Sequence, residues 1–114
     1  MARASQTTQQ ITRTGLEPVL TEPTVDGDIV DCGNVALMVV NGSAGSINVT
    51  VTATASQDGL DLEDLVVAVP AGDTMLIGPL PKRTFGQASD SADAGRAYVD
   101  YSAQTDVDRA VISF

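Results

Sequence analysis

The feature that most constrains the fold is an unbroken alternation of apolar and polar side chains over residues 47–54. Ile, Val and Ala occupy the odd positions of this stretch, and Asn or Thr occupies the even ones. Successive side chains of a β-strand point to opposite faces, so the pattern is typical of a strand with one buried face and one wet face. The chain is therefore expected to be built from sheets.

Short apolar or alternating runs, separated by Gly, Pro and Asp turns, continue along the rest of the chain. The runs that predict strands are residues 29–32, 35–40, 46–54, 66–69, 74–77, 82–85, 97–103 and 110–114. Short strands at this spacing fit a sandwich or a small barrel. We therefore predict an all-β fold, a single antiparallel β-sandwich or small barrel of roughly seven to eight short strands with an extended N-terminal arm.

Three local features refine this prediction. Residues 35–40 are apolar on both faces, which predicts a central strand. The turn at residues 41–45 is rich in Asn and Gly, which adopt positive φ readily, so we expect it to join this strand to the alternating strand as a hairpin. We also expect a helical turn at residues 60–65 and a short edge strand at residues 82–85.

The charge distribution divides the chain into two parts. Residues 1–16 carry Arg3 and Arg13 and no acid, whereas residues 17–114 carry four basic and fifteen acidic side chains. The first ten residues are rich in Ser, Thr and Gln and have little to bury. We predict an extended arm over residues 1–16, of which residues 1–10 are disordered or become ordered only on a partner, and a β-sandwich domain over residues 17–114.

The net charge, the lengths of the apolar runs and the cysteine count exclude several classes of partner and compartment. A net charge of −9 repels nucleic acid and anionic lipid, so neither is expected as a partner. No segment approaches the roughly 18 apolar residues needed to span a bilayer, and the first thirty residues contain no apolar run typical of a cleaved signal. Cys32 is the single cysteine, which excludes an internal disulfide and predicts a small buried hydrophobe.

The residues that usually perform chemistry are scarce. The chain has no His to activate a Ser, Thr or Cys nucleophile, and Lys82 follows a Pro on what we expect to be an exposed turn. Asp100, Asp106 and Asp108 suggest the paired carboxylates of a glycosidase, but four aromatic side chains are too few for a sugar-binding cleft. We predict no catalytic residue, no cofactor and no enzymatic activity.

One acidic segment is a candidate cation site. Residues 58–64 contain four carboxylates, and Ca²⁺ prefers several oxygen ligands from a flexible loop. The spacing differs from that of an EF-hand, and Leu60 and Leu62 interrupt the acids. We therefore interpret this segment as a solvated loop and predict no metal site.

Three strings carry a family resemblance: VPAGDT at residues 69–74, IGPL at residues 77–80 and QITRTGLEP at residues 10–18. They resemble a pattern in small structural proteins encoded beside the major capsid protein in tailed bacteriophages. With residues 35–54 and 98–101, the likeness spans nearly the whole chain. It implies a β-sandwich virion protein, a capsid decoration (cement) protein that binds the major capsid protein on the exterior of the shell.

The physical features agree with that role, because a cement protein occupies many identical sites and needs only modest contacts at each. We expect Ile11 and Leu16 to supply apolar anchors and Arg13 a charge-assisted hydrogen bond to a capsid carboxylate. Lys82 and Arg83 form the only adjacent basic pair and are candidates for docking on an acidic patch of a partner or of a second copy. The alternative interpretation of that pair is ordinary solvation.

The resemblance leaves other roles open. A homotrimer or another homo-oligomer around local threefold positions of the capsid would suit a decoration protein, made in the host cytoplasm and carried on the virion exterior. A head–tail connector or tail-end protein is the first alternative and would occur as one ring per particle. A carbohydrate-binding adhesive sandwich is the second, and the scarcity of aromatic residues disfavours it.

Overall fold

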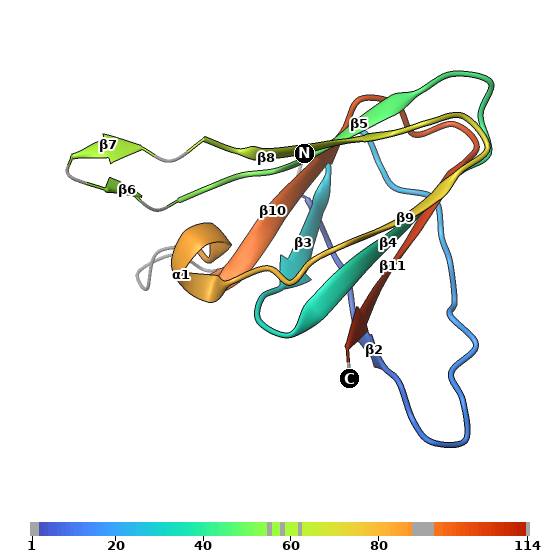
Figure 1. Cartoon of the computed structure of the whole chain (residues 1–114), viewed down its shortest axis with the longest axis horizontal. Helices are drawn as coiled ribbons and strands as arrows, with labels where there is room; N and C mark the ends of the chain where they lie inside the picture. Colours follow the sequence, from blue (N-terminus) through green and yellow to red (C-terminus); the bar gives the residue numbers. More distant parts are fainter. Residues whose placement is uncertain (1–2, 55, 58, 62, 88–92, 114) are drawn as a thin grey trace.

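The computed structural model describes residues 3–54, 56–57, 59–61, 63–87 and 93–113. Two mixed β-sheets of five and four strands pack face to face, and they do not close into a barrel (Figure 1). The predicted sandwich is confirmed at this level, whereas the barrel alternative and the purely antiparallel pairing are wrong. A helix of one turn, α1 (Lys82–Phe85), completes the structure.

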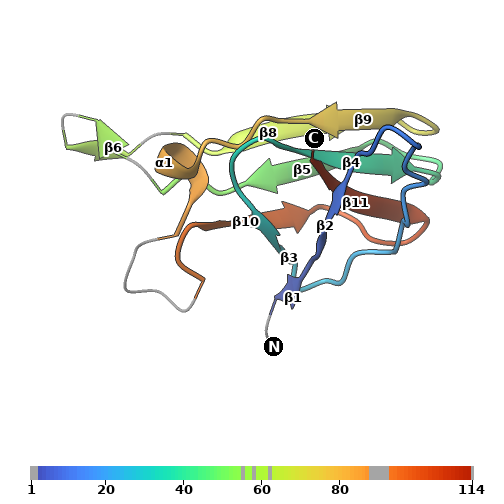
Figure 2. The ribbon, with the colours of Figure 1, turned by 90° about the horizontal axis from the view of Figure 1, so that it is seen from below.

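The five-stranded sheet has the order β1-β3-β10-β5-β8, and the four-stranded sheet has the order β2-β11-β4-β9. The first contains β1 (Ala4–Ser5), β3 (Asp28–Asp31), β10 (Arg96–Tyr101), β5 (Ile47–Val51) and β8 (Leu65–Val69). The second contains β2 (Thr8–Gln10), β11 (Val107–Ser113), β4 (Val35–Asn41) and β9 (Thr74–Ile77). A small hairpin, β6 (Ser56–Gln57) and β7 (Leu60–Asp61), extends between β5 and β8. Figure 2 shows β8 and β9 along one margin of the sandwich and β1 and β2 toward the other.

The core lies between the sheets and is built mainly from Val and Leu. The alternation over β5 buries Ile47, Val49 and Val51, while β4 presents Leu37 and Val39 from the opposite sheet. Fully burying each such side chain stabilises the fold by about 1.5–3 kcal/mol. The predicted strands at β3, β4, β5, β8, β9, β10 and β11 are confirmed, and β4 is central because it has neighbours on both sides.

The predicted hairpin between residues 35–40 and 46–54 is wrong. β4 and β5 belong to different sheets, so the turn at residues 41–45 carries the chain across the core. A hairpin would keep both strands in one sheet, whereas this crossing lets their buried faces pack against each other. Similar crossings join β8 to β9 and β10 to β11, so these three turns change sheet rather than reverse a strand within one.

Asn41 ties these crossings together at one end of the sandwich. Its buried side-chain amide donates hydrogen bonds to the carbonyl oxygens of Gly45 and Val69, each at 2.9 Å. The next residue, Gly42, donates its N–H to the carbonyl of Asp106 at 2.8 Å. One side chain and its neighbour thus connect the β4–β5, β8–β9 and β10–β11 turns.

Two further local predictions are wrong. Residues 82–85 form α1 instead of an edge strand, because the N–H groups of Thr84 and Phe85 bond to the carbonyl of Pro81 and Phe85 turns into the core. Residues 60–61 form β7 instead of a helical turn, since they pair with β6 across a turn in which Gly59 has a φ of 81°.

The start of the chain also differs from the expected free arm. β1 runs parallel to β3, and β2 runs parallel to β11, so residues 4–10 add an edge strand to each sheet. The N–H of Gln6 bonds to the carbonyl of Ile29 at 2.9 Å, and that of Ile11 bonds to Ser113 at 2.8 Å. Polar side chains in these strands find partners within the chain, which compensates for their small apolar area.

Candidate functional site

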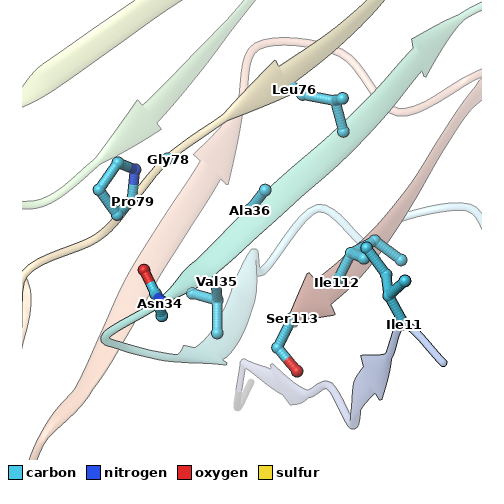
Figure 3. Close-up of a pocket in the computed structure, with 9 residues that line it drawn as sticks. All are labelled: Ile11, Asn34, Val35, Ala36, Leu76, Gly78, Pro79, Ile112 and Ser113. Atoms are coloured by element: carbon cyan, nitrogen blue, oxygen red, sulfur yellow. The ribbon is translucent and has the colours of Figure 1, made fainter. Parts of the chain in front are cut away.

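An apolar groove of about 320 Å³ lies on the outer face of the four-stranded sheet. It is bounded by the end of β11, the start of β4, the end of β9 and the residue that follows β2 (Figure 3). The side chains that shape it come from residues far apart in the sequence: Ile11, Ala36, Leu76, Pro79, Ile112 and Ser113. None of the described residues that line the groove is charged.

Strand register explains the hollow. Ala36 of β4 lies opposite Ile112 of β11, so a small side chain sits beside a large one. At Gly78 the chain passes so close to β4 that an added Cβ would lie 2.4 Å from the carbonyl oxygen of Val35. Small residues therefore form the floor of the groove, and Leu76 rises at its side (Figure 3).

The groove exposes apolar surface that the fold leaves uncovered. Leu76 is 66% exposed and Ile11 is 41% exposed, although both are large hydrophobic side chains. Single exposed hydrophobics are common, whereas two of them beside one hollow make it a candidate interaction site. The lining is mostly apolar, with Asn34 and Ser113 as its polar members, so this surface suits contact with an apolar group.

The structure brings only one of the predicted contact residues to this groove. Ile11 lines it, while Leu16 is half-buried and Arg13 exposed in the loop after β2. Lys82 and Arg83 are exposed on α1 and do not line the groove. Within the described residues these three basic side chains form no ion pair, whereas each of the other three arginines does.

Sequence reasoning missed Leu76, Pro79 and Ile112 as groove residues. A signal for Ile112 was available, because residues 110–112 are continuously apolar and all three are buried although successive residues face opposite sides of β11. Leu76 carried no comparable signal, since an apolar residue in a short strand is equally consistent with burial.

A buried charged cluster joins the two sheets away from the groove. Arg109 of β11 binds Asp28 of β3 in a bidentate pair, with Nε–Oδ2 at 2.6 Å and Nη2–Oδ1 at 2.8 Å. Tyr101 donates its hydroxyl to the same Asp28 Oδ2 at 2.7 Å, and Arg109 also bonds to the side chain and carbonyl of Thr21. Asp28 is fully buried and Arg109 is 3% exposed.

The electrostatics of this cluster keep its charges in place. Burial acts to lower the pKa of Arg109, but the hydrogen bonds and negative charge of Asp28 raise it above the ordinary value. Burial, reinforced by the charge of Asp28, raises the pKa of the Tyr101 hydroxyl well above its usual range. The cluster is shielded from solvent and satisfied by its own partners, so its role is to hold the sheets and the loop at Thr21 together.

Two further ion pairs, both partly exposed, fasten the N-terminal segment. Arg3 binds both oxygens of Asp100, at 2.7 and 3.1 Å, and its guanidinium lies 4.6 Å from the ring centre of Tyr98. Arg96 binds Asp31 at 3.0 Å and donates to the hydroxyl of Ser5 at 2.6 Å. Asp100, one of the three candidate glycosidase carboxylates, is therefore the partner of an arginine.

The acidic segment and Cys32 are the remaining candidate positions. Asp58 and Leu62 of the acidic segment lie outside the described residues, and the Asp64 carboxylate accepts the Ala53 N–H at 2.9 Å. In the described part of the chain, no group of three or more His, Cys, Asp or Glu is placed to hold a metal ion. Nor does that part contain a helix with the length and apolarity to cross a membrane. Cys32 is half-buried, and burial together with the charge of Asp31 raises the pKa of its thiol.

Comparison of the chain with models of protein families, with curated protein sequences and with solved structures finds no match.

Proposed function

We propose that this chain is a capsid decoration protein that binds the exterior of a bacteriophage shell through the groove on its four-stranded sheet. The observation that carries the proposal is the apolar hollow in which Leu76 and Ile11 are exposed beside Ile112. The groove takes an apolar side chain or short apolar segment of the major capsid protein. The resemblance to small proteins encoded beside that protein supplies the class of partner.

The energetics suit a protein present in many copies. Burying one side chain such as Leu76 or Ile11 contributes at most about 1.5–3 kcal/mol, so a single groove gives modest affinity. Binding to a shell with many identical sites needs no more than that at each site, and linked copies gain through effective concentration. In this proposal Arg13, Lys82 and Arg83 contact acidic groups of the shell or of a neighbouring copy in a homo-oligomer.

The test measures binding to shells assembled from the major capsid protein of the same phage. Leu76→Asp and Ile11→Asp place a charge in the groove, and each should reduce shell occupancy by about tenfold or more because an unpaired carboxylate would be desolvated on docking. Val25→Asp is the matched control, since Val25 is 73% exposed and lies outside the groove. Its occupancy should stay unchanged.

Occupancy is read by gel densitometry of sedimented shells, with thermal unfolding as a check that each variant is folded. Equal binding by the Leu76 variant and the Val25 control would overturn the proposal. Copy number separates the decoration role from its first alternative: a decoration protein appears in many copies per particle, and a connector appears as a single ring. A copy number that corresponds to a single ring per particle would contradict the decoration role.

A further inference from the structure

β8 forms an unprotected edge of the five-stranded sheet. It pairs with β5 on one side only, and among the described residues no strand lies on its other side. Its five residues, Leu65–Val69, contain no charged or polar side chain. Val66 is 56% exposed and Ala68 is also exposed, so this strand presents apolar side chains along a free edge.

The pairing pattern shows which backbone groups face away from the sheet. The carbonyl of Asn48 and the N–H of Thr52 bond to residues on the β10 side of β5. Bonding directions alternate along an antiparallel strand, so the odd residues of β5 bond to β8, and their partners there are Leu65, Val67 and Val69. The N–H and C=O groups of Val66 and Ala68 therefore point outward, ready for a further strand.

The other sheet edges are shorter or covered. β1 has two residues and is flanked by Arg3 in its ion pair with Asp100. Beside β2, the Gln9 side-chain amide donates a hydrogen bond to the carbonyl of Val19 and accepts one from the Val19 N–H, each at 2.9 Å. β9 has four residues. Proteins normally block exposed edges with charges, Pro or cover, and β8 has none of these along its length.

The charge around β8 indicates what would pair with it. Glu63 and Asp64 precede the strand and Asp73 follows it, all exposed, and no Lys or Arg occurs anywhere in residues 17–81. Antiparallel pairing of two β8 strands would bring Glu63 and Asp64 of one copy beside Asp73 of the other. Like charges at both ends oppose that arrangement, whereas a strand with basic ends would be attracted to both.

We infer that β8 accepts an extended segment of a partner protein, with small apolar side chains along its middle and Lys or Arg at both ends. The segment adds a sixth strand to the sheet through main-chain hydrogen bonds to Val66 and Ala68. The basic ends lie against Glu63, Asp64 and Asp73. This site lies on a different sheet from the groove and goes beyond the proposed shell binding.

The probe is a synthetic peptide of alternating Val and Thr with Lys pairs at both ends, and its matched control carries Glu in place of Lys. Titration is followed by amide chemical shifts and amide exchange of the full chain. The Lys peptide should give saturable shifts at β8 and slow the exchange of the Val66 and Ala68 N–H groups. The Glu peptide should bind at least about tenfold more weakly, and added salt should weaken the Lys peptide.

Two variants locate the site. Val66→Lys puts a like charge on the edge and should reduce affinity for the Lys peptide by about tenfold or more. Val25→Lys, on an exposed loop, should leave affinity unchanged, and Val66→Thr should retain most of it because Thr keeps the β-branched shape. Thermal unfolding confirms that each variant is folded.

Equal affinity for the Lys and Glu peptides would overturn the inference. So would shifts that fall on β9 or the groove instead of β8, or a homodimer of the chain that Val66→Lys abolishes. Loss of shell binding in the Leu76 variant with peptide binding intact would leave this inference standing. The two proposals can therefore fail separately.

Discussion

The two margins of the five-stranded sheet differ in how their edge strands are held. At the β1–β3 margin, arginines from β10, β11 and the N-terminal segment bind Asp28, Asp31 and Asp100. At the β8 margin no ion pair occurs among the described residues, and the strand is held by its ladder to β5 and by apolar contacts. Paired charges therefore fix the first margin, while the second has a uniformly apolar strand with a free edge.

The largest expected effect comes from breaking the buried pair of the β1–β3 margin. Arg109→Met leaves the Asp28 carboxylate buried without its charged partner, which should lower the free energy of unfolding by about 3–5 kcal/mol. Denaturant titration measures the change. The double variant Arg109→Met with Asp28→Leu removes both charges and should recover most of the loss, and a single-variant loss below about 1 kcal/mol would contradict this account.

A glycine beside the first margin gives the next effect. Gly27 has a φ of 84°, and an added Cβ would lie 2.5 Å from Arg3 Nη1 and 2.6 Å from Asp100 Oδ1. The carbonyl oxygen of Val99 would also lie 2.6 Å from that Cβ, so Gly27→Ala should cost about 2–3 kcal/mol through backbone strain, the clash with this carbonyl and displacement of the ion pair. The control is Gly72→Ala, at a φ of 78° in the turn after β8, where no atom lies within 4 Å of the added Cβ.

Gly72→Ala should lower the free energy of unfolding by about 1 kcal/mol, the cost of placing a side chain at a positive φ. Thermal or chemical unfolding of the two variants gives the difference. If the two substitutions cost the same, the close approach of Arg3 to Gly27 contributes nothing and the tethering of this margin is weaker than described.

The third effect concerns the Tyr101 hydroxyl and depends on pH. Because its pKa is raised in the folded state, the folded protein keeps this proton above pH 10.0, the ordinary value, where the unfolded chain releases it. Stability should therefore fall as pH rises above that point. Tyr101→Phe should lose about 1–2 kcal/mol at neutral pH with the hydrogen bond to Asp28, and should show a smaller fall at alkaline pH.

Unfolding free energies across the alkaline range test the sign. Tyr98→Phe is the comparison, because Tyr98 is only half-buried and lies on the outer side of β10. A Tyr101→Phe protein with the same alkaline loss as the parent chain would contradict the role of this hydroxyl.

The smallest effect is expected at the β8 margin. Val66→Lys changes an exposed side chain that contacts no ion pair, so the free energy of unfolding should stay within about 0.5 kcal/mol of the parent value. Chemical denaturation provides the measurement. A loss of several kcal/mol would mean that this margin carries tertiary contacts as important as those of the opposite one.

Much of the strand content was predictable because side-chain period is a local property. The alternation over β5, β10 and part of β11 shows this period directly, and the run of β4, apolar on both faces, marks a strand covered on both sides. Sheet membership was not predictable in this way. The residues of the turn at 41–45 suit a hairpin and a crossing equally, and the contacts that accompany the crossing, such as the Asn41 bond to the carbonyl of Val69, join residues far apart in the sequence.

The polar parts of the structure were harder for a related reason. In the sequence Asp28 lies between a Gly and a short apolar run, with no local signal for burial, yet it is buried because Arg109 and Tyr101 approach from strands more than seventy residues later. β1 and β2 have too little apolar pattern to predict pairing, and their parallel partners lie elsewhere in the chain. For the groove, Ile11 was predicted as a contact, while its neighbours required the register of β4 and β11.

The hub at Asn41 has a consequence for how this molecule tolerates change. Three turns are joined through Asn41 and Gly42, so lengthening any of them would disturb the other two, and that end of the sandwich should resist loop grafting. The β6–β7 hairpin, by contrast, lies outside the two main sheets (Figure 1). A tag or a displayed peptide inserted there would leave the framework intact, which makes the two ends of the molecule unequal as engineering sites.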